Sequence, residues 1–292
     1  MWFSRKTSTK SERKPKYTLG LALSGGGARG LAHLGFLKVL EREKIKVDYL
    51  SGTSMGSIIA AAYARGMDLS EMEDEILKAT TTRSMMRLVN VAPPTRGFLE
   101  VGKVRTMLTR FIPEALTFAD LKIPLAVCAT DLIHATSITL DHGEVLSAVM
   151  ASCAVPGIFP AVNFPPYTLV DGGVLNNLPV DLVKKLGAKR TIAVDVQLNP
   201  FVTTPWDELP VTTRVPLHVP TTIKDVLWSA MMMSARITQV NMQVTPPDLY
   251  ICSKVPRDIT MFMGFQKAAE IIAEGEKSAE ENLPAIRKVL GI

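Results

Sequence analysis

The sequence is poor in cysteine and has no long apolar segment. Its 292 residues include three cysteines, Cys128, Cys153 and Cys252, which are far apart in the chain. An odd number of cysteines without a CxxC pair argues against a disulfide framework and against a zinc site, and is typical of a reducing compartment. No run of about 18 or more apolar residues occurs, so we expect no transmembrane helix. No apolar stretch of signal-peptide length follows the basic residues at the start, so we expect no signal peptide.

Charge is concentrated at the start of the chain. The net charge is +5, and the first 16 residues hold six Lys or Arg and one Glu, so six minus one accounts for all of it. Such a distribution does not indicate a nucleic-acid partner. We expect residues 1–15 to form a disordered basic tail. A second interpretation is transient contact of Trp2, Phe3 and the cations with an anionic membrane surface. The expected location is cytoplasmic, at most peripheral to the inner face of the membrane.

Strand and helix patterns alternate along the chain after the tail. The first strand, near 16–24, ends in glycines and precedes a predicted helix over 28–44; a second strand near 47–51 precedes a helix over 54–66. This alternation predicts an α/β fold with a parallel sheet and helices packed on it. Nearly half of the residues are apolar, which is enough for a substantial core.

The later segments continue the pattern. We predict helices over 68–120, with a break at "APPTRG", and one domain over 16–292 that comprises a motif-bearing part, 17–197, and a helical part, 221–292. The remaining predicted elements are strands over 124–132, 136–140, 165–171, 189–197 and 248–253, helices over 144–152, 179–186 and 221–243, a terminal helix, and a Pro- and Thr-rich loop from Asn199 to Pro220.

The first glycine-rich turn is "LSGGGARGLAHLG". Gly25, Gly27 and Gly30 match GxGxxG between a strand and a helix. A dinucleotide fold also needs an acidic residue about 20 positions later at the carboxyl end of the next strand. Asp48 lies about 20 positions later, but at the amino end of its predicted strand rather than at the carboxyl end. A nucleotide-binding protein that uses this loop for phosphate stays an alternative, because N–H groups at a helix N-terminus favour negative charge, either of a phosphate or of a transient oxyanion.

The second turn is "GTSMG", a GxSxG motif between a strand and a helix. In this context small residues at Gly52 and Gly56 allow a sharp nucleophile elbow that exposes Ser54. The N–H of Met55, the next residue, is the expected oxyanion donor. The alternative is an ordinary N-cap serine.

A nucleophilic serine needs a base, and no histidine is well placed to supply it. His33 lies in the first predicted helix, His134 at the start of a strand, and His142 in the turn "DHG". His218 lies late in the chain, but in a proline-bounded loop without another catalytic signature.

The third turn, "LVDGGVLNNLPV", offers a carboxylate instead. Asp171 ends an apolar strand and is followed by Gly172 and Gly173, although Asp-Gly turns are also common structural features. Three glycine-lined turns at the carboxyl ends of strands are expected to converge at one edge of a parallel sheet. Asp171 would then lie beside Ser54 and accept its proton, helped by burial that raises its pKa.

Taken together, "GGGARG", "GTSMG", "DGG" and the segment "MASCAVPGIFPAV" resemble the patatin-like phospholipase family over about Tyr17 to Gln197. The resemblance implies a three-layer α/β/α fold with a central, mostly parallel sheet. It also implies a lipid acyl hydrolase that cleaves carboxylic esters of phospholipids or lysophospholipids through a Ser-Asp dyad and an acyl-enzyme, with a lipid or other acyl ester as its partner and with no cofactor or metal. A non-catalytic regulatory protein on the same fold stays an alternative, and the oligomeric state is left open.

The resemblance assigns roles to individual residues. Ser54 is the implied nucleophile and Asp171 the base. The implied oxyanion donors are Gly25, Gly26, Gly27 and Met55, and the supporting motif residues are Arg29, Gly30, Gly52, Gly56, Gly172 and Gly173.

Methionines cluster in the predicted helix over 221–243. Met231, Met232 and Met233 have two interpretations: an ordinary helix–helix contact, or an adaptable apolar lining at the mouth of the site.

Overall fold

The computed structural model describes residues 17–88, 100–197, 221–256, 258–259 and 264–292. The predicted tail over 1–15 and the loop from Asn199 to Pro220 lie outside the described residues, as does His218.

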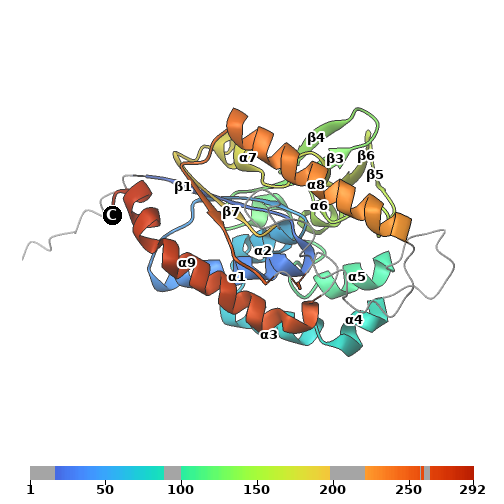
Figure 1. Ribbon diagram of the computed structural model, residues 1–292, viewed down its shortest axis with the longest axis horizontal. Helices are drawn as coiled ribbons and strands as arrows, with labels where there is room; N and C mark the ends of the chain where they lie inside the picture. Colours follow the sequence, from blue (N-terminus) through green and yellow to red (C-terminus); the bar gives the residue numbers. More distant parts are fainter. Residues whose placement is uncertain (1–16, 89–99, 198–220, 257, 260–263) are drawn as a thin grey trace, which may run out of the picture.

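A twisted eight-stranded sheet forms the centre of the molecule (Figure 1). The strand order is β5-β6-β3-β2-β1-β7-β8, and β4 pairs with β3 beside this path. Neighbours among β3, β2, β1, β7 and β8 are parallel, whereas β4, β5 and β6 run antiparallel to their partners. The strands are β1 (Leu19–Leu23), β2 (Tyr49–Thr53), β3 (Leu125–Asp131), β4 (Thr136–Leu140), β5 (Val162–Phe164), β6 (Tyr167–Asp171), β7 (Arg190–Asp195) and β8 (Leu249–Cys252).

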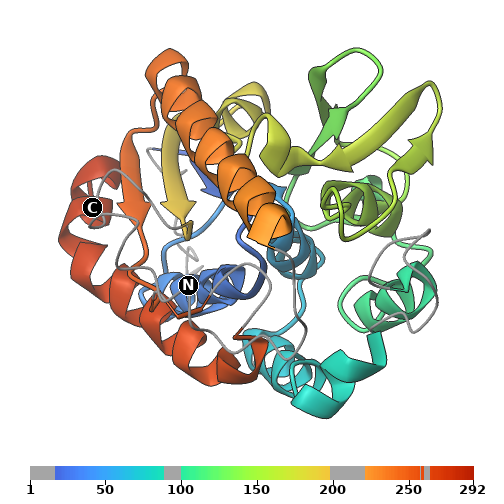
Figure 2. The same ribbon diagram turned by 45° about the vertical axis from the view of Figure 1, so that its right-hand side comes forward.

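Helices cover both faces of the sheet (Figures 1 and 2). The α-helices are α1 (Ala32–Arg42), α2 (Met55–Ala64), α3 (Leu69–Ala79), α4 (Thr82–Leu88), α5 (Val101–Leu108), α6 (Val145–Ser152), α7 (Val180–Lys185), α8 (Thr221–Val244) and α9 (Ala268–Leu290). Short 3-10 helices lie at η1 (Gly27–Leu31), η3 (Phe118–Asp120), η4 (Gly172–Val174) and η6 (Phe265–Lys267).

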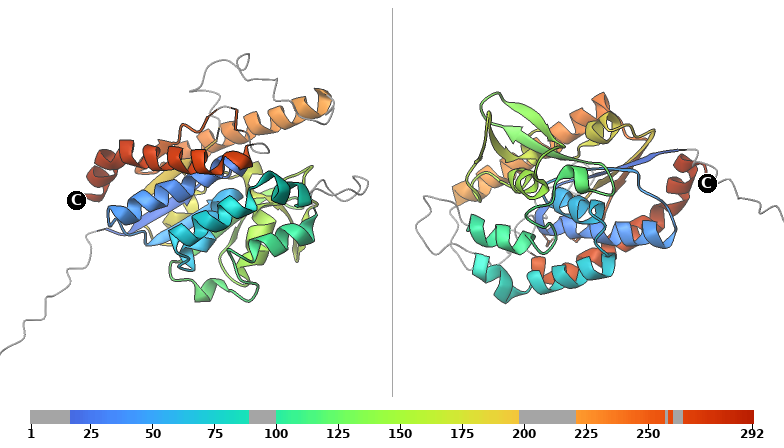
Figure 3. Two further views of the ribbon diagram at one scale, coloured as in Figure 1. Left: turned by 90° about the horizontal axis from the view of Figure 1, so that it is seen from below. Right: turned by 180° about the vertical axis from the view of Figure 1, so that it is seen from behind.

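The two faces of the sheet bury residues of different size. In β1, Leu21 and Leu23 enter the main core, which α1, α2, α6 and α9 share, while Ala22 faces α7 and Met242 of α8. Strands buried on both faces are typical of a parallel sheet between two helical layers. Figure 3 shows the same arrangement from below and from behind. The predicted three-layer α/β/α fold with a mostly parallel sheet is therefore confirmed.

The pairing of β3 corrects one expectation from the sequence. β6 runs antiparallel to β3, so Asp171 does not end a strand of the parallel set. Since Val127 pairs with both β2 and β4, and Ala129 with both β4 and β6, β2 and β6 must share the same edge of β3. They lie end to end along that edge with their carboxyl ends facing each other.

Most other local elements follow the sequence patterns, but β5 was not predicted, and residues 165–166 of the predicted strand lie between β5 and β6. The predicted first helix is divided into η1 and α1, and the region 68–120 contains α3, α4 and α5. None of the helices in the described part of the chain is long and apolar enough to cross a membrane.

Candidate active site

Ser54 occupies a strained turn between β2 and α2. Its φ of 51° and ψ of −125° lie where a residue with a side chain is rarely found. The strand and helix approach so closely that a Cβ on Gly52 would come within 2.6 Å of the carbonyl oxygen of Gly56. A Cβ on Gly56 would in turn collide with the backbone of Leu23. These contacts explain the glycines of GxSxG, and the turn has the geometry of a nucleophile elbow.

Two other serines hold this turn in place. The N–H of Ser54 donates to Oγ of Ser152 at 2.8 Å, and the Ser57 hydroxyl donates to the Ser54 carbonyl at 2.6 Å. Ser152 is fully buried at the end of α6. The sequence analysis missed it, although a polar residue in the apolar segment "VLSAVMAS" was a usable signal.

Asp171 lies in a buried position beside this turn. Its side chain is 5% exposed, and Oδ1 accepts the N–H of Gly173 at 2.7 Å. Burial raises the pKa of Asp171 to about 6, and the nearby Ser54 hydroxyl and the Gly173 N–H oppose that rise. Oδ2 is buried and accepts no standard hydrogen bond from the described residues. A reoriented Ser54 hydroxyl would supply the missing donor.

The glycine-rich loop faces the elbow, but Gly25 has a different part in it than predicted. Its N–H donates to the carbonyl of Asn177 at 3.1 Å, and the Asn177 amide donates back to the Gly25 carbonyl at 3.3 Å. The expectation that Gly25 supplies an oxyanion donor is therefore wrong, because its N–H is already bonded. The N–H groups of Gly26, Gly27 and Met55 have no partner among the described residues.

Asn177 is a second residue that sequence analysis missed. It follows the Asp171 turn in "DGGVLNN" and joins that turn to the glycine-rich loop. The segment continues across the end of β2, where Thr53 donates to the Asn176 carbonyl at 2.9 Å. Consecutive asparagines after a glycine turn were the available signal.

Arg29 does not point toward Ser54. It is 3% exposed, and its guanidinium donates to four carbonyl oxygens at 2.6–3.1 Å. The acceptors are Val196, Val255, Pro256 and Ile259. Burial lowers its pKa to about 10, so it stays charged at neutral pH. Arg29 thus ties the glycine-rich loop to the segment that follows β8.

We expect Arg29→Lys to destabilise the fold by about 2–4 kcal/mol. An ammonium group keeps the charge but cannot present a planar fork to four carbonyls, so buried acceptors lose their donor. Guanidinium unfolding at pH 7 measures the change. Arg42→Lys is the matched control, because Arg42 is half-exposed and pairs with Glu280 and Glu43 at the surface. Equal unfolding midpoints for the two variants would contradict the role given to Arg29.

None of the described histidines is hydrogen-bonded to Ser54. His33 is fully buried and Nε2 donates to the Ser24 carbonyl at 2.8 Å, while burial lowers its pKa to about 4 and keeps it neutral. His33 therefore stabilises the start of the glycine-rich loop, because Ser24 directly precedes Gly25. His134 lies in the β3–β4 turn rather than in a strand, where it contacts Asp131, and His142 is exposed.

Asp48 lies at the opposite edge of the sheet from the glycine-rich loop. Its Oδ2 accepts the N–H of Leu19, the first residue of β1, at 2.9 Å. A carboxylate at the amino end of β1 cannot reach a ribose bound beyond the carboxyl end. The nucleotide-binding alternative thus loses its acidic residue.

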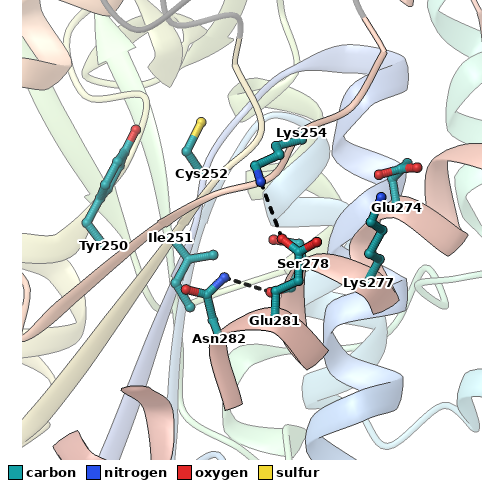
Figure 4. Close-up of a pocket in the computed structure, with 9 residues that line it drawn as sticks. All are labelled: Tyr250, Ile251, Cys252, Lys254, Glu274, Lys277, Ser278, Glu281 and Asn282. Atoms are coloured by element: carbon teal, nitrogen blue, oxygen red, sulfur yellow. Dashed lines mark hydrogen bonds and ion pairs between the residues drawn. The ribbon is translucent and has the colours of Figure 1, made fainter. Parts of the chain in front are cut away.

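Two pockets lie away from the Ser54–Asp171 pair. The first, about 320 Å³, lies between β8 and α9 and is lined largely by polar and charged residues such as Lys254, Glu274 and Lys277 (Figure 4). The second, about 260 Å³, lies under α8 beside Asn176 and Met242. Neither Ser54 nor Asp171 lines either pocket.

α8 packs over the Asp171 turn through polar contacts. The Ser234 hydroxyl donates to the Gly173 carbonyl at 2.7 Å, and the Asn241 amide donates to the Leu175 carbonyl at 2.9 Å. Met232 and Met233 are 46% and 60% exposed. The interpretation that the methionines fill an ordinary helix–helix contact is therefore wrong for these two.

Several known proteins are similar to this chain. Patatin-like phospholipase domain-containing protein 6 of Homo sapiens is 35% identical over 184 residues, which are 61% of this chain and 13% of that protein. Lysophospholipase NTE1 of Scheffersomyces stipitis is 32% identical over 183 residues, 61% of this chain and 12% of that protein. The crystal structure of VipD from Legionella pneumophila superimposes with a TM-score of 0.49 at 16% identity, covering 98% of this chain and 72% of that one.

This chain thus spans about an eighth of the length of those two sequence relatives. The family match is independent of their length. Residues 21–184, more than half of the 292, match the model of the family described as Patatin-like phospholipase. The matched range includes Ser54, Asp171 and the glycine-rich loop, and the chain belongs to the patatin-like phospholipase family.

Proposed function

We propose that this protein is a serine acyl hydrolase that cleaves carboxylic ester bonds of lipids through a Ser54–Asp171 dyad. The observation that carries the proposal is the pairing of a strained, half-buried serine with a buried carboxylate whose Oδ2 lacks a donor. A carboxylate with a pKa of about 6 is a stronger base than an ordinary Asp and is still largely ionised at pH 7.

The proposed first step is acylation of Ser54. The ester carbonyl oxygen points at the N–H groups of Gly26, Gly27 and Met55, which stabilise the negative charge that develops on it. Oγ of Ser54 attacks the carbonyl carbon while its proton passes to Oδ2 of Asp171. The tetrahedral intermediate collapses, and the leaving alcohol takes the proton from Asp171.

The proposed second step is hydrolysis of the acyl-enzyme. Asp171 accepts a proton from water as the water oxygen attacks the same carbonyl carbon. Collapse of the second intermediate releases the carboxylic acid and returns the proton to Oγ of Ser54. A nucleophile, a base and three N–H donors carry both steps.

A phospholipid or a lysophospholipid is the proposed substrate class. Membership of a phospholipase family supports it, and one relative is named a lysophospholipase. A cytoplasmic location, peripheral to the membrane, belongs to the same proposal; the three unpaired cysteines support it.

Reaction with a fluorophosphonate tests the proposal, since this reagent phosphonylates an activated serine. We expect intact-mass analysis to detect one adduct per chain and peptide mapping to place it on Ser54. Hydrolysis of p-nitrophenyl butyrate, a soluble ester, should be lost in proportion to labelling. A folded wild-type protein that neither reacts nor hydrolyses the ester would overturn the proposal.

A further inference from the structure

The outer face of α8 carries a continuous apolar stripe. We call Val226, Ala230, Met233, Ile237, Val240 and Val244 the outer stripe. Their spacing alternates between four and three residues, so they lie along one side of the helix over about 27 Å at 1.5 Å per residue. Four of them are 45–78% exposed, namely Val226, Met233, Val240 and Val244.

Other sides of α8 contact the domain. Ala235 and Thr238 are 8% and 3% exposed and face the domain. The contacts of Ser234 with Gly173 and of Asn241 with Leu175 fasten the helix on the turn that follows Asp171. The helix therefore lies on the outside of the molecule, as Figure 2 shows for its orange ribbon. Four side chains of the outer stripe stay exposed there.

The charge on this helix fits a lipid surface. No acidic residue occurs between Val226 and Val244, and Arg236 is the single charged residue in that range. Acidic groups would be repelled by anionic lipid headgroups, whereas an apolar face with a cation at its border is typical of helices that lie in a membrane interface.

A second copy of the chain fits the stripe less well. A coiled-coil partner is usually selected by charged residues that flank the apolar seam, but the flanks here are mainly uncharged, with Asn241 and Gln243 among them. Stable protein interfaces bury about 20 or more residues on each side, well beyond the few exposed side chains of the stripe.

We propose that the outer stripe docks this protein on a lipid surface. Ser234 of the same helix contacts Gly173, two residues from Asp171, so the docked helix would lie next to the proposed site. The inference rests on the proposed function for its lipid substrate, and it adds the element that would bring the site to the substrate.

Co-sedimentation with phosphatidylcholine vesicles tests this docking. Neutral vesicles keep the basic start of the chain from contributing, and all proteins carry Ser54→Ala so that the vesicles are not consumed. We expect the pair Met233→Glu with Val240→Glu to bind vesicles at least tenfold more weakly than the parent. The pair Gln239→Glu with Gln243→Glu adds the same charge to the same helix off the stripe and should bind like the parent.

Several outcomes would overturn the docking proposal. They are a parent that does not sediment with vesicles, equal binding by the stripe pair and its control, or a parent that light scattering shows to be a dimer that only the stripe pair dissociates. The pair Met233→Ser with Val240→Ser repeats the comparison if the glutamates impair folding, as judged by circular dichroism.

Hydrolysis of p-nitrophenyl butyrate by wild type, with Ser54 restored, separates this inference from the proposed function. Stripe-dependent vesicle binding without ester hydrolysis would retain the docking surface and reject the hydrolase. Ester hydrolysis together with vesicle binding that does not depend on the stripe would retain the hydrolase and reject the docking surface.

Discussion

Replacing Ser54 by alanine is expected to lower kcat/KM for p-nitrophenyl butyrate by at least about 10⁴-fold. Losses of this size follow when an enzyme loses its nucleophile, because the remaining oxyanion donors cannot form an acyl-enzyme. Fluorophosphonate labelling should disappear together with hydrolysis. Ser147→Ala, on the surface of α6, is a control that should keep both.

The backbone of Ser54 gives this test a second readout. Ser54→Gly removes the same hydroxyl but tolerates a φ of 51° without strain, so it should be more stable than Ser54→Ala by about 1 kcal/mol in urea unfolding. Activity of either variant within tenfold of the wild type would exclude Ser54 as the nucleophile.

Replacing Asp171 by asparagine is expected to lower kcat/KM by about 10³-fold or more, since the variant lacks a base for Ser54. In the wild type, kcat/KM should fall tenfold per pH unit below about pH 6, where the carboxylate takes up a proton. The residual activity of the variant should lack this acid limb. An unchanged pH profile in Asp171→Asn would show that another group is the base.

The same substitution is expected to stabilise the protein at pH 8. The folded pKa of Asp171 is raised from 3.8 to about 6, so the native state binds the proton more tightly than the unfolded chain does. Stability therefore falls as pH rises from about 4 to about 6, and above that range the ionised carboxylate costs up to about 3 kcal/mol.

Asparagine avoids this cost while its amide oxygen can still accept the N–H of Gly173. The gain should be present at pH 8 and absent near pH 4, as measured by urea unfolding at both values. An asparagine variant that is less stable than the wild type at pH 8 would contradict the raised pKa.

Local patterns predicted most of the elements and the three turns, because strand and helix periodicity and glycine-marked turns depend on neighbouring residues. They did not predict the direction of β6. The direction of β6 depends on its pairing with β3, and the paired residues are about 40 positions apart in the sequence. Ser54 and Asp171 are close because β2 and β6 meet end to end along β3. The prediction had instead placed both residues at the carboxyl ends of parallel strands.

Two further differences have the same physical origin. The N–H of Gly25 is bonded by Asn177, a residue more than 150 positions later, which no motif within the loop reveals. The exposure of Met232 and Met233 depends on which side of α8 meets the sheet, and composition alone does not define that side.

Because β2 and β6 lie end to end along β3, this strand sets the distance between the Ser54 turn and the Asp171 turn. Thr53 pairs with Cys128 and Asp171 with Ala129, so adjacent positions of one strand set the spacing between the two turns. Inserting a single residue between Cys128 and Ala129 would leave both turns intact in sequence yet move one relative to the other by about 3.3 Å. It would also reverse the faces of the residues beyond it. The alignment of nucleophile and base is thus sensitive to a strand that supplies neither of them.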